Sequence, residues 1–218
     1  MCLLLFLSNV LVISLTGVLA PGPVTAAAIG MGSTNRLAGL FMALGHGIVE
    51  FQLMLLLLLG VGRWLKRPSM NIPIGLAGGG FLVFLAVQMF RGLGGSGPGP
   101  AQAAGNSPLV AGILLSAGNP YFLIWWATVG LTLITTARTF GLWAFGLMAL
   151  VHWSCDLVWL TVLSWASFQG SVLLGPRGQQ VVLAVCAAAM LAFGLYFLVL
   201  QVIRLTGGKK PVDTPESV

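Results

Sequence analysis

Charged residues, and acidic ones above all, are scarce in this sequence. Of 218 residues, four are Asp or Glu, ten are Lys or Arg and two are His, and charged residues make up 6% of the chain. Soluble domains carry roughly 25% charged residues, so this chain has too few to cover a water-exposed surface. Its three cysteines give no sign of a disulfide framework. The composition therefore excludes a soluble globular domain and favours a protein embedded in lipid.

Long apolar runs take the place of the missing charge. Apolar residues make up 58% of the chain and the mean hydropathy is +1.01. Unbroken runs such as 53–59 lack the alternation of a membrane β-barrel strand, and a helical span needs about 20 apolar residues. The sequence therefore predicts an all-α, polytopic membrane protein with about six transmembrane helices. They are predicted at residues 2–31, 37–61, 72–90, 108–135, 140–165 and 181–203.

The basic residues predict the orientation of these spans. With an even number of spans, one side of the membrane holds seven of them: Arg63, Lys66, Arg67, Arg138, Arg204, Lys209 and Lys210. The opposite side holds three, Arg36, Arg91 and Arg177. Loops rich in Lys and Arg stay in the cytoplasm. We therefore expect a multi-pass protein of the plasma membrane, anchored in the lipid bilayer, with both termini cytoplasmic.

A Gly/Pro-rich stretch predicts how the chain is divided. Residues 92–107 have the composition of a flexible linker between a first three-helix repeat at 1–91 and a second at 108–203, and a polar tail follows at 204–218. An odd number of spans in each half gives the two halves opposite orientations. Inverted repeats of this kind are common among secondary transporters.

Each half carries helix-breaking residues inside its leading apolar segment. Because broken backbone inside a membrane must line a cavity or lie within protein, paired breaks in matching places point to a transporter's binding site. A plain kink is the alternative for either break. The sequence therefore predicts broken first and fourth helices and substrate-binding residues at Pro21, Gly22, Pro23, Gly118, Asn119 and Pro120.

Four ionisable residues fall inside predicted spans, as two pairs four residues apart. They are His46 and Glu50 in the second span, and His152 and Asp156 in the fifth. A spacing of four places both side chains of a pair on one helix face, and ionisable groups inside a membrane normally mark an ion or substrate path. Three interpretations stay open: a proton or cation relay, a transition-metal site with these two histidines and two carboxylates as ligands, and hydrogen-bonded pairs that only hold helices together.

Enzyme motifs are missing from the sequence. It contains no His-Glu-x-x-His, no Gly-x-Ser-x-Gly and no phosphate-binding loop of the Walker type. We expect neither an enzyme nor a cofactor, and no nucleic-acid partner. The tryptophans in the second half are interpreted as interface anchors or packing residues: Trp125, Trp126, Trp143, Trp153, Trp159 and Trp165.

The break motifs also carry a family resemblance that covers nearly the whole chain. Its carriers are Ala20-Pro21-Gly22-Pro23, the step Arg36-Leu37-Ala38-Gly39, the stretch from Leu44 to Glu50, and Gly118-Asn119-Pro120 before an aromatic and apolar run. With these motifs, the chain resembles the lysine exporter (LysE/RhtB-type) family of small membrane transporters.

The resemblance implies a function and an assembly. It implies export of amino acids or related small solutes, driven by the proton gradient or the membrane potential, and a homodimer. Two positions depart from the family's pattern: Val24 stands where members often carry Asp, and Tyr121 where they often carry Lys. The wider superfamily includes exporters of divalent cations. We therefore expect a proton-coupled secondary transporter that exports a small solute, with a divalent metal exporter and a non-transporting membrane subunit as alternatives.

Overall fold

The structure is a computed structural model that describes residues 2–20, 22–61, 68–93, 107–173 and 175–206. Within these ranges the chain is almost entirely helical and contains no strand. The helices are α1 (Leu3–Val18), α2 (Pro23–Gly32), α3 (Ala38–Leu58), α5 (Pro68–Leu93), α7 (Pro108–Ala117), α8 (Pro120–Trp125), α9 (Leu131–Thr139), α10 (Leu142–Leu173) and α11 (Gly175–Thr206), with a π-helical turn η1 (Trp126–Gly130) between α8 and α9. The predicted fold class, an all-α polytopic membrane protein, is confirmed.

Five helical segments are long and apolar enough to cross a membrane, and α1 and α2 together make a sixth if the bent pair is one span. The prediction of about six spans is therefore confirmed. The last two helices continue beyond their predicted ends, since α10 reaches Leu173 and α11 begins at Gly175. Hydropathy identifies only the apolar part of a helix, whereas backbone hydrogen bonding continues through the polar residues that follow it.

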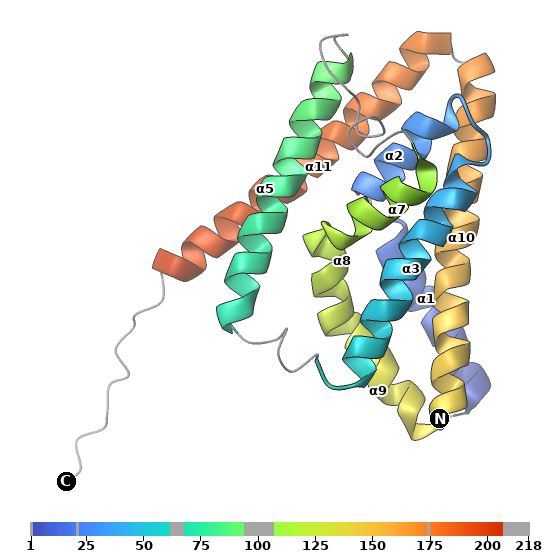
Figure 1. Cartoon of the computed structure of the whole chain (residues 1–218), viewed down its shortest axis with the longest axis vertical. Coiled ribbons are helices and arrows are strands. Elements are labelled where there is room, and N and C mark those ends of the chain that lie inside the picture. The colour runs from blue at the N-terminus through green and yellow to red at the C-terminus, as the bar shows by residue number, and fades with distance from the viewer. Residues whose placement is uncertain (1, 21, 62–67, 94–106, 174, 207–218) are drawn as a thin grey trace.

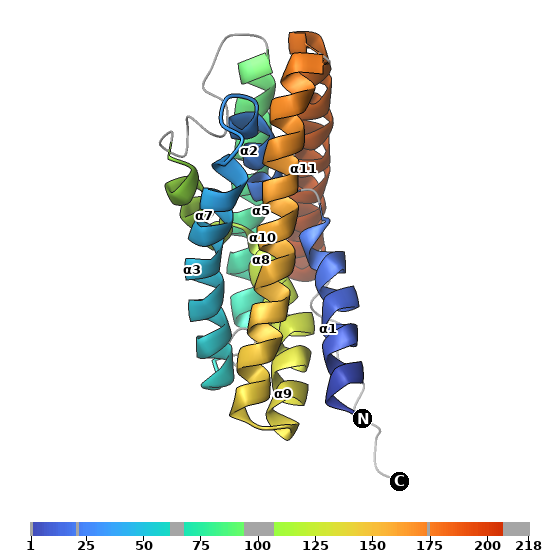
Figure 2. The same cartoon turned by 90° about the vertical axis from the view of Figure 1, so that its right-hand side faces the viewer.

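The spans run alternately in opposite directions (Figure 1). The unit of α1 and α2 runs upward in this view, α3 downward, α5 upward, the unit from α7 to α9 downward, α10 upward and α11 downward. Figure 2 shows α10 between α3 and α1, and it contacts both helices. The two central helices, α3 and α10, therefore lie antiparallel to one another.

Both leading segments are broken, as predicted. Helix α1 ends at Val18, and α2 begins at Pro23 after a bend of 75°. In the second half α7 ends at Ala117 and α8 begins at Pro120. A proline fits the first position of a helix because its missing N–H would have no helical partner there. Both prolines thus start a new helix in the middle of an apolar segment.

Glycines let the central helices approach closely. A Cβ on Gly45 of α3 would meet the backbone carbonyl of Leu109, and one on Gly112 of α7 would meet that of Met42. A Cβ on Gly39 would likewise meet the carbonyl of Leu160 in α10. Small residues permit such contacts between membrane helices. They bring α7 and α10 against α3, which positions the side chains described below.

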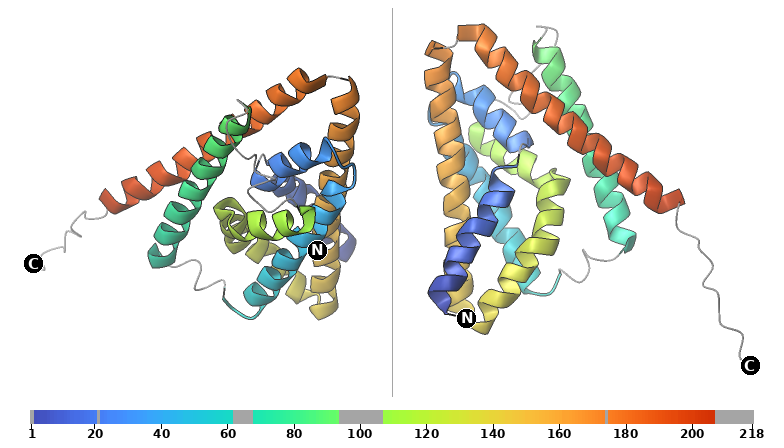
Figure 3. Two further views of the ribbon diagram at one scale, coloured as in Figure 1. Left: turned by 45° about the horizontal axis from the view of Figure 1, so that its top comes forward. Right: turned by 180° about the vertical axis from the view of Figure 1, so that it is seen from behind.

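Helices α5 and α11 form a pair on one side of the molecule (Figure 3). Helix α11 crosses α5 at an angle, and the backbones meet at Gly79 and Gly194, where an added Cβ on either glycine would contact the other's carbonyl oxygen at about 3 Å. The pair contacts the rest of the protein through α8, α2 and α10. Most of the predicted linker, 94–106, and of the predicted tail, 207–218, lies outside the described residues, so the division into two repeats stays a prediction.

Candidate functional site: a buried cluster of two histidines and two carboxylates

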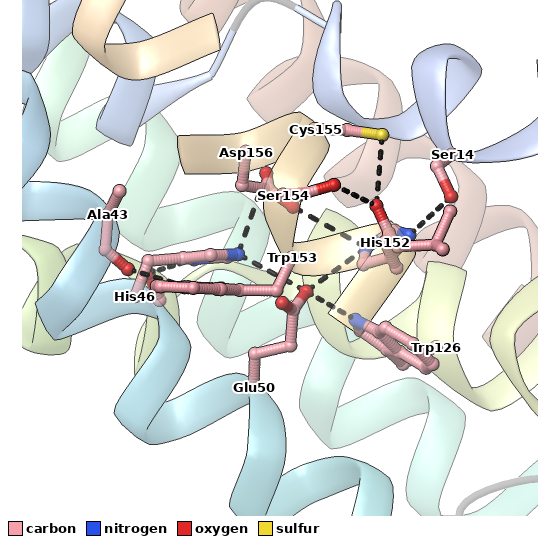
Figure 4. Close-up of polar contacts among 12 residues, drawn as sticks. Ser14, Ala43, His46, Glu50, Trp126, His152, Trp153, Ser154, Cys155 and Asp156 are labelled. Carbon is pink, nitrogen blue, oxygen red and sulfur yellow. Dashed lines mark hydrogen bonds and ion pairs between the residues drawn. The ribbon is translucent and has the colours of Figure 1, made fainter. Parts of the chain in front are cut away.

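The four ionisable residues predicted inside the membrane meet in one cluster (Figure 4). His46 Nε2 lies 3.3 Å from Glu50 Oε1 and 3.7 Å from Asp156 Oδ1. His152 Nε2 lies 3.1 Å from Glu50 Oε1 and 3.5 Å from Asp156 Oδ2. Each histidine therefore contacts the acid of its own helix and the acid of the other.

The antiparallel packing of α3 and α10 explains why each histidine contacts the acids of both helices. Each helix presents a histidine and, one turn later, an acid on the same face. Because the two helices run in opposite directions, the histidine of one helix lies beside the acid of the other. The sequence predicted the two pairs, and the structure shows that they converge.

The cluster is closed off from the surface of the protein. Glu50 is fully buried, and His152, His46 and Asp156 keep at most 8% of their surface. An unpaired charge at such a position costs several kcal/mol. The charges of the four groups must therefore be balanced within the cluster or by something bound to it.

Two serines contact the Nδ1 atoms of the imidazole rings, on the opposite edge from the acids. His46 Nδ1 lies 2.7 Å from Ser116 Oγ of α7, and His152 Nδ1 lies 2.7 Å from Ser14 Oγ of α1. Each serine also donates a hydrogen bond to a carbonyl of its own helix, Ser116 to Gly112 at 2.5 Å and Ser14 to Val10 at 2.6 Å. Both serines are fully buried.

The two acids differ in how firmly they are held. Glu50 Oε1 also accepts a hydrogen bond from Trp126 Nε1 at 3.2 Å, so three nitrogen atoms surround one oxygen. The contacts of Asp156 with the two histidines are longer, at 3.7 and 3.5 Å. Glu50 Oε2 and Asp156 Oδ2 both have no hydrogen-bond partner within the described part of the chain. Glu50 is thus the fixed acid of the cluster, and Asp156 the more loosely held one.

Aromatic rings enclose the histidines. The Trp125 ring stacks on His152 with centroids 5.1 Å apart, Trp126 meets the same ring edge-on at 4.9 Å, and Phe122 meets His46 edge-on at 5.0 Å. Such walls limit the directions in which the imidazoles can turn.

A cavity of about 80 Å³ joins the cluster to both helix breaks. The four ionisable side chains line it, and so do Gly22 and Pro23 at the first break and Asn119 at the second. Its other walls are mostly aromatic and apolar, and include Tyr121, Phe122, Trp125, Trp126, Trp159, Met190 and Phe193.

The remaining predicted substrate-binding residues lie elsewhere. Gly118 packs against Phe81, and an added Cβ on Gly118 would meet the Phe81 ring. Pro120 packs against Gly78 of α5, and an added Cβ on Gly78 would meet the Pro120 side chain. Neither residue is among those that line the cavity. Pro21 is outside the described residues.

The cluster also has the donor atoms of a metal site. One ligand atom each from His46, Glu50 and Asp156 lies within 4.8 Å of the others. Imidazole nitrogen with carboxylate oxygen is a donor set that suits divalent transition metals. The chemistry and spacing of these three residues therefore fit such an ion.

Sequence reasoning missed Ser14 and Ser116 and assigned no site role to Trp126. The tryptophan was interpreted as an anchor or packing residue, whereas it is 1% exposed and bonds to Glu50. The serines left a signal that could have been used. Each lies within one turn of the end of the apolar helix that precedes a break, and Ser116 is the one polar side chain of α7.

Comparison with protein families shows which family the chain belongs to. A family model described as LysE type translocator matches residues 15–201, which is most of the sequence. Comparison with curated proteins and with solved structures gave no match. The matched region includes the cluster, the cavity and both breaks, so the predicted resemblance is confirmed. The chain belongs to the LysE type translocator family and is a membrane transporter.

Proposed function

We propose that this transporter exports a small solute, an amino acid or a related compound, in exchange for protons carried by His46, Glu50, His152 and Asp156. One observation carries the proposal: all four intramembrane ionisable groups converge on a single buried cavity that also reaches both helix breaks. Residues with only a packing role would not need to share a cavity with the broken helices.

Charge balance explains why the cluster binds protons. With both carboxylates ionised and both imidazoles neutral, the cluster carries a charge of about −2, which is costly inside a membrane. Protonating both imidazoles balances it. The cluster can therefore take up protons when it faces one side and release them when a positively charged group replaces them.

The helix breaks supply the solute's other contacts. The first turn of α2, at Gly22, Pro23 and Val24, lines the cavity, and the start of a helix carries a partial positive charge that favours a carboxylate. Among the residues that the structure describes, no Lys or Arg lines the cavity. An ammonium group of the same solute would lie by the carboxylates, in the place of the displaced protons.

A divalent metal ion is the second candidate substrate. It is favoured by the ligand atoms of His46, Glu50 and Asp156, which lie within 4.8 Å of one another. One divalent ion would replace two protons without changing the charge of the cluster.

Transport in vesicles tests the relay. Purified protein is reconstituted with a pH-sensitive dye inside, and a panel of amino acids and divalent ions is offered one at a time. The Glu50→Gln, Asp156→Asn double variant should reduce solute-driven proton flux to the rate of empty vesicles. The amides carry no negative charge to hold protons on the imidazoles, and they cannot release a proton themselves. The matched control makes the same changes at the chain's other two acids, Asp213→Asn and Glu216→Gln, and should keep the flux. Undiminished flux in the first variant would end the relay hypothesis.

Thermal unfolding separates the remaining candidates. If the cluster binds metal, adding a divalent ion should raise the melting temperature of the wild type, since a ligand stabilises the state that binds it. It should leave His46→Ala unchanged. If the four residues only hold helices together, their substitution should lower the melting temperature and leave transport per molecule intact.

We further propose that the protein lies in the plasma membrane with both termini cytoplasmic. The alternating helix directions bring the start of α1 and the end of α11 to the same side of an even number of spans, and Arg138 and Arg204 lie toward that side. Reporters fused after Arg204 should score cytoplasmic and those after Arg91 external. An external signal at Arg204 would contradict the even number of spans. The homodimer stays a prediction, which the mass of the purified protein would test.

A further inference from the structure

The hydrogen bonds of two buried serines determine which nitrogen of each histidine carries a proton. A serine hydroxyl has one proton to donate and can accept with its lone pairs. Ser116 donates its proton to the Gly112 carbonyl at 2.5 Å, and Ser14 donates to the Val10 carbonyl at 2.6 Å. Each serine can then only accept from the histidine that lies 2.7 Å away. The Nδ1 atom of both rings must therefore be a donor.

A proton fixed on Nδ1 leaves Nε2 as the site of exchange. Both Nε2 atoms face carboxylate oxygens, at 3.3 and 3.7 Å for His46 and at 3.1 and 3.5 Å for His152. A neutral ring protonated on Nδ1 would direct its Nε2 lone pair at those oxygens, and the two would repel. A proton or a metal ion on Nε2 turns the same contact into an attraction.

Each serine belongs to the half opposite its histidine. Ser14 lies on α1 and bonds to His152 of α10, while Ser116 lies on α7 and bonds to His46 of α3. The state of each ring therefore depends on a contact between a broken helix of one half and the central helix of the other.

We propose that Ser14 and Ser116 are positioning residues that hold both histidines as the Nδ1-protonated form, so that the cluster loads and releases its cations at Nε2. Because each hydrogen bond joins the two halves, movement of α1 against α10, or of α7 against α3, would release the ring and link cation exchange to conformation. The assignment of the proton to Nδ1 rests on geometry alone, and its link to exchange rests on the proposed function.

The two histidines of this chain make the assignment measurable, because a ¹⁵N-histidine label reports on these residues and no others. In the full-length wild type, nitrogen NMR should show a protonated Nδ1 in both rings at every pH, including where the rings are neutral. Free histidine, by contrast, prefers the proton on Nε2. A neutral ring with a bare Nδ1 in the wild type would overturn the proposal.

Single substitutions assign the two signals. Ser116→Ala should change the Nδ1 signal of one ring, that of His46, and Ser14→Ala that of the other. Ser8→Ala is the matched control, because Ser8 lies on α1 like Ser14 but is exposed and bonds only to its own helix. It should leave both signals unchanged. Ser116→Thr keeps the hydroxyl and should preserve the wild-type signal. Unchanged spectra in both alanine variants would also overturn the proposal.

Proton flux in vesicles tests the link to exchange separately. Ser14→Ala and Ser116→Ala should each slow solute-driven flux about tenfold, the effect of losing one buried hydrogen bond, and Ser116→Thr should restore it. Normal flux with shifted NMR signals would contradict the link. Should the Glu50→Gln, Asp156→Asn variant keep its flux, the proton relay fails while the NMR result still decides where the protons lie.

Discussion

The two predicted halves of the transporter contain similar parts that are built in different ways. Each has a broken leading segment, a buried serine before the break, and a central helix with a histidine one turn before an acid. The parts meet across the halves, because His46 bonds to Ser116 and His152 to Ser14. This reciprocal arrangement brings four costly polar groups together where they can satisfy one another.

The halves differ in how tightly their parts are held. Both acids face both histidines. Glu50 is fully buried and also accepts a hydrogen bond from Trp126, whereas the contacts of Asp156 with the histidines are 3.5 and 3.7 Å long. For the helix breaks, the second half is the more firmly held one. Asn119 caps α8 through a hydrogen bond from Tyr121 N at 3.1 Å, while Gly22 gives α2 no side-chain cap. The first half thus has a firmly held acid and an uncapped break, and the second half has a loosely held acid and a capped break.

Removing the acids should produce the largest difference between the halves. We expect Glu50→Ala to destabilise the protein by about 3–5 kcal/mol, because it removes the partner of a buried charge. Asp156→Ala should cost about 1–3 kcal/mol, since its contacts are longer. Thermal unfolding in detergent measures both. Equal losses would show that the two acids are held equally firmly.

Filling the close contact between α3 and α7 should have the next largest effect. A Cβ at Gly45 or Gly112 would meet a backbone carbonyl, so alanine at either position should destabilise by about 1–3 kcal/mol. The two variants should behave alike, because they fill the same contact from opposite halves.

Two other helical glycines supply the control for this contact. An added Cβ at Gly80 or Gly146 would meet nothing within 4 Å, so alanine there should stabilise by about 0.5–1 kcal/mol. Chemical unfolding in detergent would compare all four variants. Stabilisation by Gly45→Ala would contradict the close approach of the two helices.

The smallest expected effects compare the breaks themselves. Asn119→Ala removes a helix cap and should cost about 1 kcal/mol. Gly22→Ala should not lower stability, because its backbone is extended and its new methyl group would have neighbours no closer than 3.8 Å. The methyl group would instead narrow the cavity between Gly22 and Asn119 and slow transport. A Gly22→Ala protein that is destabilised but transports normally would contradict both expectations for this break.

Sequence alone determined the membrane environment, the approximate number of spans and the identity of the four ionisable residues inside them. Apolar runs of about 20 residues have one stable solution in lipid, and prolines at matching places led to both breaks. The pairs at His46 and Glu50, and at His152 and Asp156, followed from helical periodicity within one segment.

Only the tertiary structure decided that these pairs form one site. A spacing of four residues fixes neighbours on a single helix, but it says nothing of which helix lies opposite. The contacts of His46 with Ser116 and of His152 with Ser14 join residues 70 and 138 positions apart. They depend on the crossing of α3 with α7 and of α1 with α10, and at α3 and α7 on glycines that let two backbones meet. Such contacts arise from helix packing in three dimensions, and local periodicity cannot predict them.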